Sequence, residues 1–335
     1  MSVVARWWRG WVAFTSEREP AFLLAFFRIA IGLCAISSLV SAATSGVLDV
    51  MWVDASGGGA LGLSGSRLVQ LFGGATHPVI WGFFWVALAA SVLSTVGLGG
   101  RLPLLVASQV YGALVRTNAN TMGGYDSMIA IAFFLLFFSG ANETLSLDAW
   151  RKTRRFATGA LVSAWPRHVL VFQLVVIYFF TGLQKMSPVW TPAGGYSALY
   201  WVYQDPTWRR FDMDFTGALY PVLQVATAVT WHWELAAPLV LVWMWLRRTS
   251  DRGGRLRGWL LRRDLRAWYL TVGVLLHLGI LVTLNVGPFS FVSLSFYPLF
   301  FRPDELTAFA RRIRPSAAGS GSTKTLSPDP PPATS

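Results

Sequence analysis

Long runs without charged residues dominate the chain. Stretches lacking Asp, Glu, Lys and Arg cover residues 29–48, 68–100, 102–115, 127–142, 168–184, 215–233, 235–246 and 267–301. A helix of about 20 apolar residues is long enough to cross a bilayer. The pattern therefore predicts an all-α fold, a polytopic membrane helical bundle in the cell membrane with the lipid bilayer as its solvent.

The last of these runs is too long for one span. Its 35 residues would form a helix of roughly 52 Å, whereas the hydrocarbon core is about 30 Å thick. Gly287-Pro288 lies near its middle, and proline ends or kinks a helix. Splitting the run there gives eight predicted spans, at about residues 21–43, 79–98, 102–117, 127–141, 168–185, 219–246, 268–287 and 288–301.

The basic residues lie between the apolar runs and indicate an orientation. With both termini in the cytoplasm, 22 of the 28 Lys and Arg residues face that side and five face the other. Cytoplasmic loops carry such an excess of positive charge. The net charge of +12 is thus a topology signal and does not indicate nucleic-acid binding.

Composition excludes a soluble fold. Hydrophobic residues make up 54% of the chain, charged residues 13%, and the mean hydropathy is +0.48, whereas soluble domains carry about 25% charged residues. The single cysteine, Cys34, rules out an intrachain disulfide. Because residues 21–43 are too long for a signal-peptide core and contain Arg28, they are interpreted as a retained first span.

Three regions follow from this pattern. Residues 1–20 are predicted to be a cytoplasmic segment, residues 21–305 the transmembrane domain, and residues 306–335 a tail that is basic and then disordered because it is rich in Ser, Gly and Pro. The loops 44–78 and 186–218 are predicted to lie on the extracytoplasmic side, where such loops often cap a cavity.

Four ionisable residues fall within the predicted spans: Arg28, Lys185, Glu234 and His277. Each costs about 2.5–3.5 kcal/mol to insert, so such residues tend to face a cavity or a partner. For Arg28, packing or snorkelling is the simpler interpretation. Glu234 needs a cationic partner, either Arg28 or Lys185, and structural pairing is as plausible as chemistry. His277 fits hydrogen-bonded scaffolding at least as well as a ligand-binding role.

Lys185 has two interpretations. Tyr178, Thr181 and Lys185 recur on one helical face and can line one cavity. Desolvation disfavours a charged ammonium, which makes a buried lysine a usable base. A lysine near the end of a span also commonly snorkels to the interface.

A polar hairpin joins two of the short spans. It contains Asn118, Asn120 and Asp126, residue types that also form plain turns. The sequence has no HExxH, CxxC or P-loop motif, so no metal or nucleotide site is predicted.

Three stretches in order along the chain resemble the HTTM family, the membrane domain shared with vitamin K-dependent gamma-glutamyl carboxylases. They are Phe26-Phe-Arg28-Ile, Tyr178-Phe-Phe-Thr-Gly-Leu-Gln-Lys185 with Trp190, and His277-Leu-Gly-Ile with Gly287-Pro-Phe-Ser-Phe. The hairpin from Asn118 to Asp126 and Leu145-Ser-Leu-Asp148 agree in register. The resemblance covers about residues 20–305.

The resemblance implies a role for Lys185. In the carboxylases the matching lysine deprotonates vitamin K hydroquinone, so Lys185 would be the catalytic base of a carboxylase-like enzyme, a carbon–carbon lyase or oxidoreductase. A reduced quinone would be its cofactor and a secreted peptide or protein its substrate. Two departures limit this: no large lumenal domain follows the last span, and Val115, Arg116 and Thr117 stand where the carboxylases have a histidine.

Other functions remain open. Stand-alone HTTM proteins also resemble SdpB-type proteins, which implies a non-catalytic factor for the maturation or export of a secreted peptide. A transporter is disfavoured because the chain has no internal repeat. The residues by themselves leave undecided whether the protein is an enzyme, and which cofactor and substrate it uses.

Overall fold

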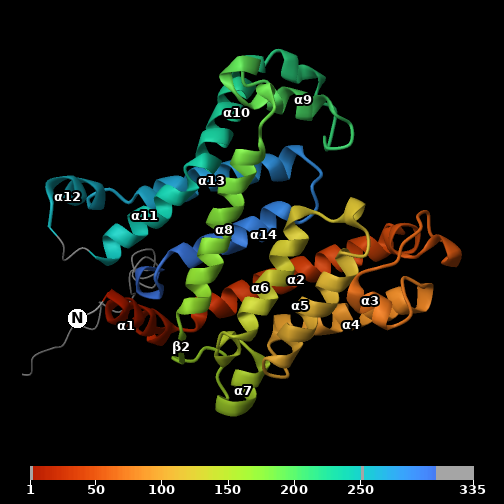
Figure 1. Ribbon diagram of the computed structural model, residues 1–335, viewed down its shortest axis with the longest axis horizontal. Coiled ribbons are helices and arrows are strands. Elements are labelled where there is room, and N and C mark those ends of the chain that lie inside the picture. Colours follow the sequence, from red (N-terminus) through yellow and green to blue (C-terminus); the bar gives the residue numbers. More distant parts are fainter. Residues whose placement is uncertain (1–2, 250–252, 307–335) are drawn as a thin grey trace, which may run out of the picture. The chain divides into compact units, whose positions relative to one another are not determined.

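The computed structural model describes residues 3–249 and 253–306 (Figure 1). Residues 1–300 form one compact unit and residues 301–335 a second. Most of the predicted disordered tail, residues 307–335, lies outside the described residues.

Helices make up nearly all of the described regular structure, which confirms the all-α fold class. The α-helices are α1 Val3–Ser16, α2 Phe22–Thr44, α3 Arg67–Leu71, α4 His77–Val96, α5 Leu102–Val115, α6 Gly124–Phe137, α7 Leu147–Thr153, α8 Trp165–Gln184, α9 Ala198–Gln204, α10 Tyr220–Leu235, α11 Ala237–Arg248, α12 Arg255–Leu261, α13 Leu265–Thr283 and α14 Phe289–Phe296. Two short strands, β1 Arg18–Pro20 and β2 Leu161–Ser163, pair antiparallel with Glu19 opposite Val162. The sequence pattern did not predict this pair.

Four of the described helices are long and apolar enough to cross a membrane alone: α2, α4, α8 and α13. The pair α10 and α11 passes the same test together and counts as a fifth span if the two are taken as one. The helices α5, α6 and α14 are apolar but shorter. The total of eight spans and the cytoplasmic placement of both termini therefore stay predictions.

The predicted span 219–246 is not one straight helix. α10 and α11 meet at Ala236 with a bend of 48°. Pro238, in the first turn of α11, has no N–H to donate and its ring crowds the preceding turn. The predicted single span is therefore corrected to two helices that meet at a bend, with Glu234 in the last turn before the bend.

The predicted break at Gly287-Pro288 is confirmed. α13 ends at Thr283 and α14 begins at Phe289. Gly287 has φ +59°, a left-handed conformation that favours glycine, and a Cβ there would lie 3.0 Å from the Tyr125 hydroxyl.

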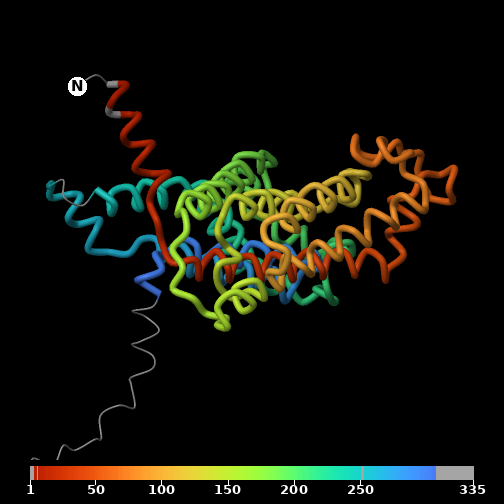
Figure 2. Tube along the Cα trace, turned by 90° about the horizontal axis from the view of Figure 1, so that it is seen from below, coloured from red at the N-terminus to blue at the C-terminus, as the bar shows by residue number. Residues whose placement is uncertain are grey.

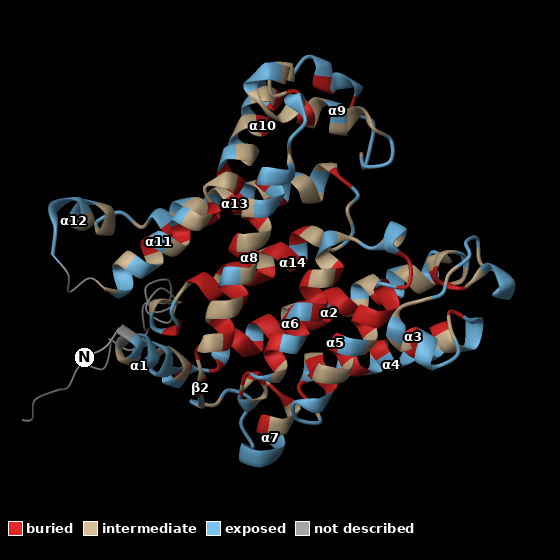
Figure 3. Ribbon diagram, in the orientation of Figure 1, coloured by how far each residue is buried: buried red, intermediate tan, exposed pale blue. Residues whose placement is uncertain are grey.

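The buried core surrounds α2. Figure 3 shows buried residues concentrated along α2, α5, α6 and α14, and α2 packs against α4, α6 and α14. The helices α8, α10, α11 and α13 form a second group. It meets the first where α8 packs against α6 and α14 and where α13 packs against α14. Many large apolar side chains on the outer faces are exposed, as a lipid-facing surface requires.

Candidate functional site

A cavity of about 430 Å³ lies between α8, α10, α13 and α14. Its volume falls within the range of about 300–1,000 Å³ typical of small-molecule sites. Part of its wall comes from the segment after α8, which includes Trp190 and Tyr203. The described lining residues are Met128, Ile177, Tyr178, Thr181, Lys185, Trp190, Leu199, Val202, Tyr203, Ala226, Thr230, Trp233, Glu234, Leu275, Leu276, His277, Gly279, Ile280, Leu284, Phe289 and Ser293.

Lys185 and Glu234 form an ion pair in this wall. The Lys185 ammonium donates to both carboxylate oxygens of Glu234, at 2.5 Å from Oε1. Only 19% of the lysine side chain and 11% of the glutamate side chain are exposed. Lys185 Nζ also lies 4.8 Å from the centre of the Trp190 ring, in cation–π geometry. The partner of Glu234 is thus Lys185 and not Arg28.

Gly182 lets α8 and α10 approach closely at this pair. A Cβ on Gly182 would lie 3.0 Å from the Cβ of Glu234 and 3.2 Å from the backbone nitrogen of Leu235. The Trp231 indole N–H donates to the Gly182 carbonyl over 3.1 Å. Small residues allow this kind of contact between membrane helices. Sequence reasoning missed this role, although a glycine three residues before a candidate base is a signal.

A second polar group lies on α8, α13 and the turn after α14. The Tyr178 hydroxyl lies 2.8 Å from His277 Nε2 and 3.2 Å from the Tyr297 hydroxyl. Gly273 leaves room for the Tyr297 side chain, because a Cβ at position 273 would lie 2.2 Å from the Tyr297 hydroxyl. Tyr297 carried no recognisable signal in the sequence.

His277 has unused hydrogen-bonding capacity. It is only 3% exposed, and its Nδ1 has no hydrogen-bond partner among the described residues. Buried polar atoms normally have partners. His277 lines the cavity, so a ligand group in the cavity is a natural partner for this nitrogen.

Of the two remaining candidates, Thr181 lies in the described cavity wall and Arg28 does not. Thr181 lines the cavity, but its hydroxyl donates to the carbonyls of Ile177 and Tyr178 within its own helix, at 2.6 and 2.9 Å. Arg28 is fully buried away from the described cavity wall.

The Arg28 guanidinium satisfies backbone carbonyls. It donates to the carbonyls of Thr95 and Leu145, at 2.7 and 2.6 Å, and to that of Ser94. Two of these belong to the last turn of α4, whose carbonyls have no partner inside the helix. Of the two interpretations offered for Arg28, packing and snorkelling, these buried contacts support packing.

The polar hairpin is a turn held by side-chain hydrogen bonds, and it contributes no residue to the described lining of the cavity. The Asn118 side-chain amide donates to the Met51 carbonyl over 2.7 Å, and its oxygen accepts the N–H of Asn120. Asp126 accepts the Tyr111 hydroxyl and the N–H of Gly123. The hairpin thus fastens α5 and α6 to the loop that follows α2.

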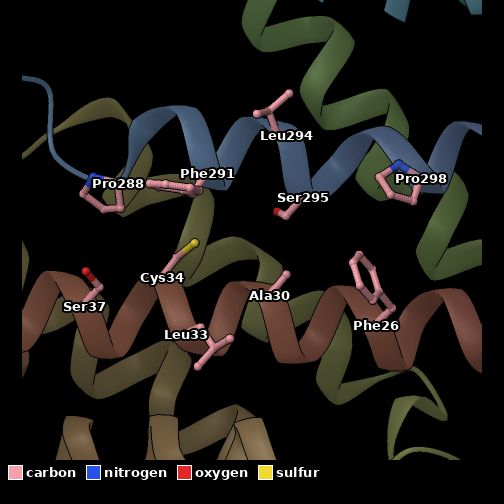
Figure 4. Close-up of a pocket in the computed structure, with 10 residues that line it drawn as sticks. All are labelled: Phe26, Ala30, Leu33, Cys34, Ser37, Pro288, Phe291, Leu294, Ser295 and Pro298. Carbon is pink, nitrogen blue, oxygen red and sulfur yellow. The ribbon is translucent and has the colours of Figure 1, made fainter. Parts of the chain in front are cut away.

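A second cavity, of about 420 Å³, lies between α2 and α14. Figure 4 shows the two helices side by side, with side chains of both along the groove. Its lining is almost entirely apolar and includes Phe26, Phe291 and the buried Cys34. No candidate site residue from the sequence lines it in the described structure. The described residues also contain no group of three or more His, Cys, Asp and Glu side chains that could hold a metal ion.

Fold and site together define an α-helical membrane protein with a buried lysine–carboxylate pair. The model of the HTTM domain family matches residues 17–252, more than half of the chain, and the protein belongs to this family. No curated protein and no solved structure matches the chain. The matched region supplies Lys185 and Glu234, whereas His277 and Tyr297 lie beyond it.

Proposed function

We propose that this HTTM-domain protein is a membrane-embedded, carboxylase-like enzyme in which Lys185 is the catalytic base toward a lipid-soluble reduced quinone. One observation carries the proposal. The Lys185 amine is held against the Glu234 carboxylate in the wall of a largely apolar cavity of ligand size. A base is useful in such a place because water is excluded.

The residues of the cavity fit a reduced quinone. Its flat ring has a hydroxyl at each end, and the cavity wall offers two separate polar groups. These are the Lys185–Glu234 pair and His277, whose Nδ1 has no hydrogen-bond partner in the part of the chain that the structure describes. Trp190 and Trp233 supply aromatic surface for a ring, and the remaining walls are mainly apolar. When bound, such a cofactor supplies the reducing equivalents for the reaction with oxygen that precedes proton abstraction from a substrate carbon.

The chain's own part is to hold and move one proton. Without a ligand the pair is charged. A ligand that fills the cavity excludes water from it, and this makes the charged pair costly and favours transfer of a proton from Lys185 Nζ to Glu234. The resulting neutral amine accepts a proton from a ligand hydroxyl, while Glu234 keeps the proton it received. Tyr178 and Tyr297 hold the His277 ring, so that its Nδ1 can orient the other end of the ligand.

The variant Lys185→Arg tests the base most directly. Arginine keeps the positive charge beside Glu234 but does not give up its proton in proteins. General base catalysis contributes about 10²–10⁴-fold. We therefore expect quinol-dependent oxygen uptake in proteoliposomes to fall at least about 100-fold in Lys185→Arg, with naphthoquinone binding retained. Lack of quinone binding by the wild type, or unchanged activity of Lys185→Arg, would refute the proposal.

A second candidate function is a non-catalytic factor for the maturation or export of a secreted peptide. The observation that favours it is the pairing of Lys185 with both oxygens of Glu234, the geometry of a structural ion pair. In that case Lys185→Arg retains full peptide production in cells and Lys185→Ala loses it through instability. The same variants thus separate the two functions.

A further inference from the structure

α1 is an amphipathic helix with an uncovered apolar face. Val4, Trp7, Trp8 and Trp11 recur at helical spacing on one side, and they are 76%, 77%, 65% and 60% exposed. Ala13 falls on the opposite side, nine residues and half a turn away from Val4. Large apolar side chains on one exposed face indicate a binding surface.

The helix lies across the direction of the first span. Figure 2 shows α1 projecting from the bundle at the start of α2 and crossing the direction in which α2 runs. Residues 17–21 join the two helices, and an extended segment of that length reaches less than about 20 Å. The tether therefore holds the C-terminal end of α1 close to the start of α2, a candidate membrane span.

The same end of the bundle carries the densest positive charge. Glu17, directly after α1, pairs with Arg248 at the end of α11, and its carbonyl accepts the N–H of Ala164 before α8. Arg257 of α12 donates to the Leu246 carbonyl over 2.5 Å. These contacts bring α1, the start of α8 and the α11–α12 region together.

Tryptophan and arginine side chains lie next to one another at this end of the bundle. Trp245, Trp259 and Trp268 are 53%, 49% and 72% exposed. The guanidinium carbons of Arg257 and Arg263 lie 5.7 and 5.4 Å from the centres of the Trp245 and Trp259 rings. Tryptophan is enriched at headgroup level, and clustered arginines attract anionic lipids.

We propose that α1 and the α11–α13 end of the bundle form a docking surface for anionic phospholipid headgroups. α1 lies in the plane of the interface with Trp7, Trp8 and Trp11 inserted among the lipids, as amphipathic interfacial helices do. Arg9 and the arginines of α11 and α12 contact the headgroup phosphates. The short tether to α2 favours the bilayer over a protein partner, because it keeps the apolar face within reach of the lipid surface next to α2.

Single-cysteine probes on the full-length protein test the depth of α1. Val4→Cys and Ala13→Cys are made in a Cys34→Ser background, labelled with an environment-sensitive fluorophore, and reconstituted in vesicles of phosphatidylcholine and phosphatidylglycerol. We expect the Val4 probe to be quenched by nitroxide on the acyl chains and the Ala13 probe by aqueous iodide. Equal iodide quenching of both probes, or disulfide dimers of the unlabelled Val4→Cys variant that show a second copy on this face, would overturn the proposal.

A charge-removing pair of variants tests the headgroup preference. Arg9→Gln should lower the docking constant of α1 about five-fold in anionic vesicles and leave it unchanged in pure phosphatidylcholine. Arg67→Gln removes the same charge from the exposed segment before α4 and is expected to have no effect. The proposal fails if docking is indifferent to phosphatidylglycerol, or if both variants shift it equally.

Discussion

The ion pair between Lys185 and Glu234 predicts strong energetic coupling between the two side chains. Replacing one partner leaves the other charged group unpaired, and only 19% of the Lys185 side chain and 11% of the Glu234 side chain are exposed. Breaking a buried pair on one side costs about 3–5 kcal/mol, whereas removing both partners is often close to neutral. Since both groups keep some exposure, we expect about 3 kcal/mol of destabilisation for Glu234→Leu and for Lys185→Met.

The double variant Lys185→Met/Glu234→Leu should recover most of this loss. Two independent losses would add to about 6 kcal/mol, so recovery to within about 1 kcal/mol of the wild type means a coupling of several kcal/mol. Thermal unfolding of the detergent-purified protein measures this, at roughly 2–4 °C per kcal/mol for a chain somewhat smaller than this one. Val222→Ala, an exposed apolar position on α10, is the control and should leave unfolding unchanged.

The result that would refute the reasoning is simple additivity. If the double variant were as unstable as the sum of the two single variants, the side chains would not interact in the folded protein. The pair would then supply neither the proton acceptor nor the structural contact inferred for it.

Three further predictions concern other positions. Gly182→Ala should destabilise the folded protein by about 1–3 kcal/mol through overpacking and weaken quinone binding, and unchanged binding in a fluorescence titration would argue against close helix approach as the determinant of the site. Arg28→Met leaves the carbonyls of Thr95 and Leu145 without their donor, at about 1–3 kcal/mol each, and should lower the unfolding temperature of the purified protein without changing ligand affinity in the fraction that stays folded. A hydrogen bond from Ser56, followed by backbone N–H groups, lowers the pKa of Asp54 to about 2, so this carboxylate stabilises its loop above about pH 4, and the stabilisation is lost as the pH falls through about 2. Pepsin cleavage of the loop should therefore rise between pH 4 and pH 2 in the wild type and stay at one level in Asp54→Asn.

The sequence determined the features that depend on local periodicity. Apolar runs located a helix in each predicted span, because a spanning helix must bury its backbone polar groups within itself whatever its neighbours are. The Gly287-Pro288 break was equally local, since proline acts on its own turn. The spacing of Tyr178, Thr181 and Lys185 placed them on one face, and the structure has all three in the cavity wall.

The tertiary structure decided which distant side chains meet. The sequence offered Glu234 two cations, and only the packing of α8 on α10 through Gly182 selected Lys185. Arg28 donates to carbonyls at the end of α4 and at Leu145, which lie 66 or more positions away along the chain. Tyr297 likewise reaches Tyr178 from a distant turn. Such contacts depend on the relative placement of whole helices, which no local pattern in the sequence encodes.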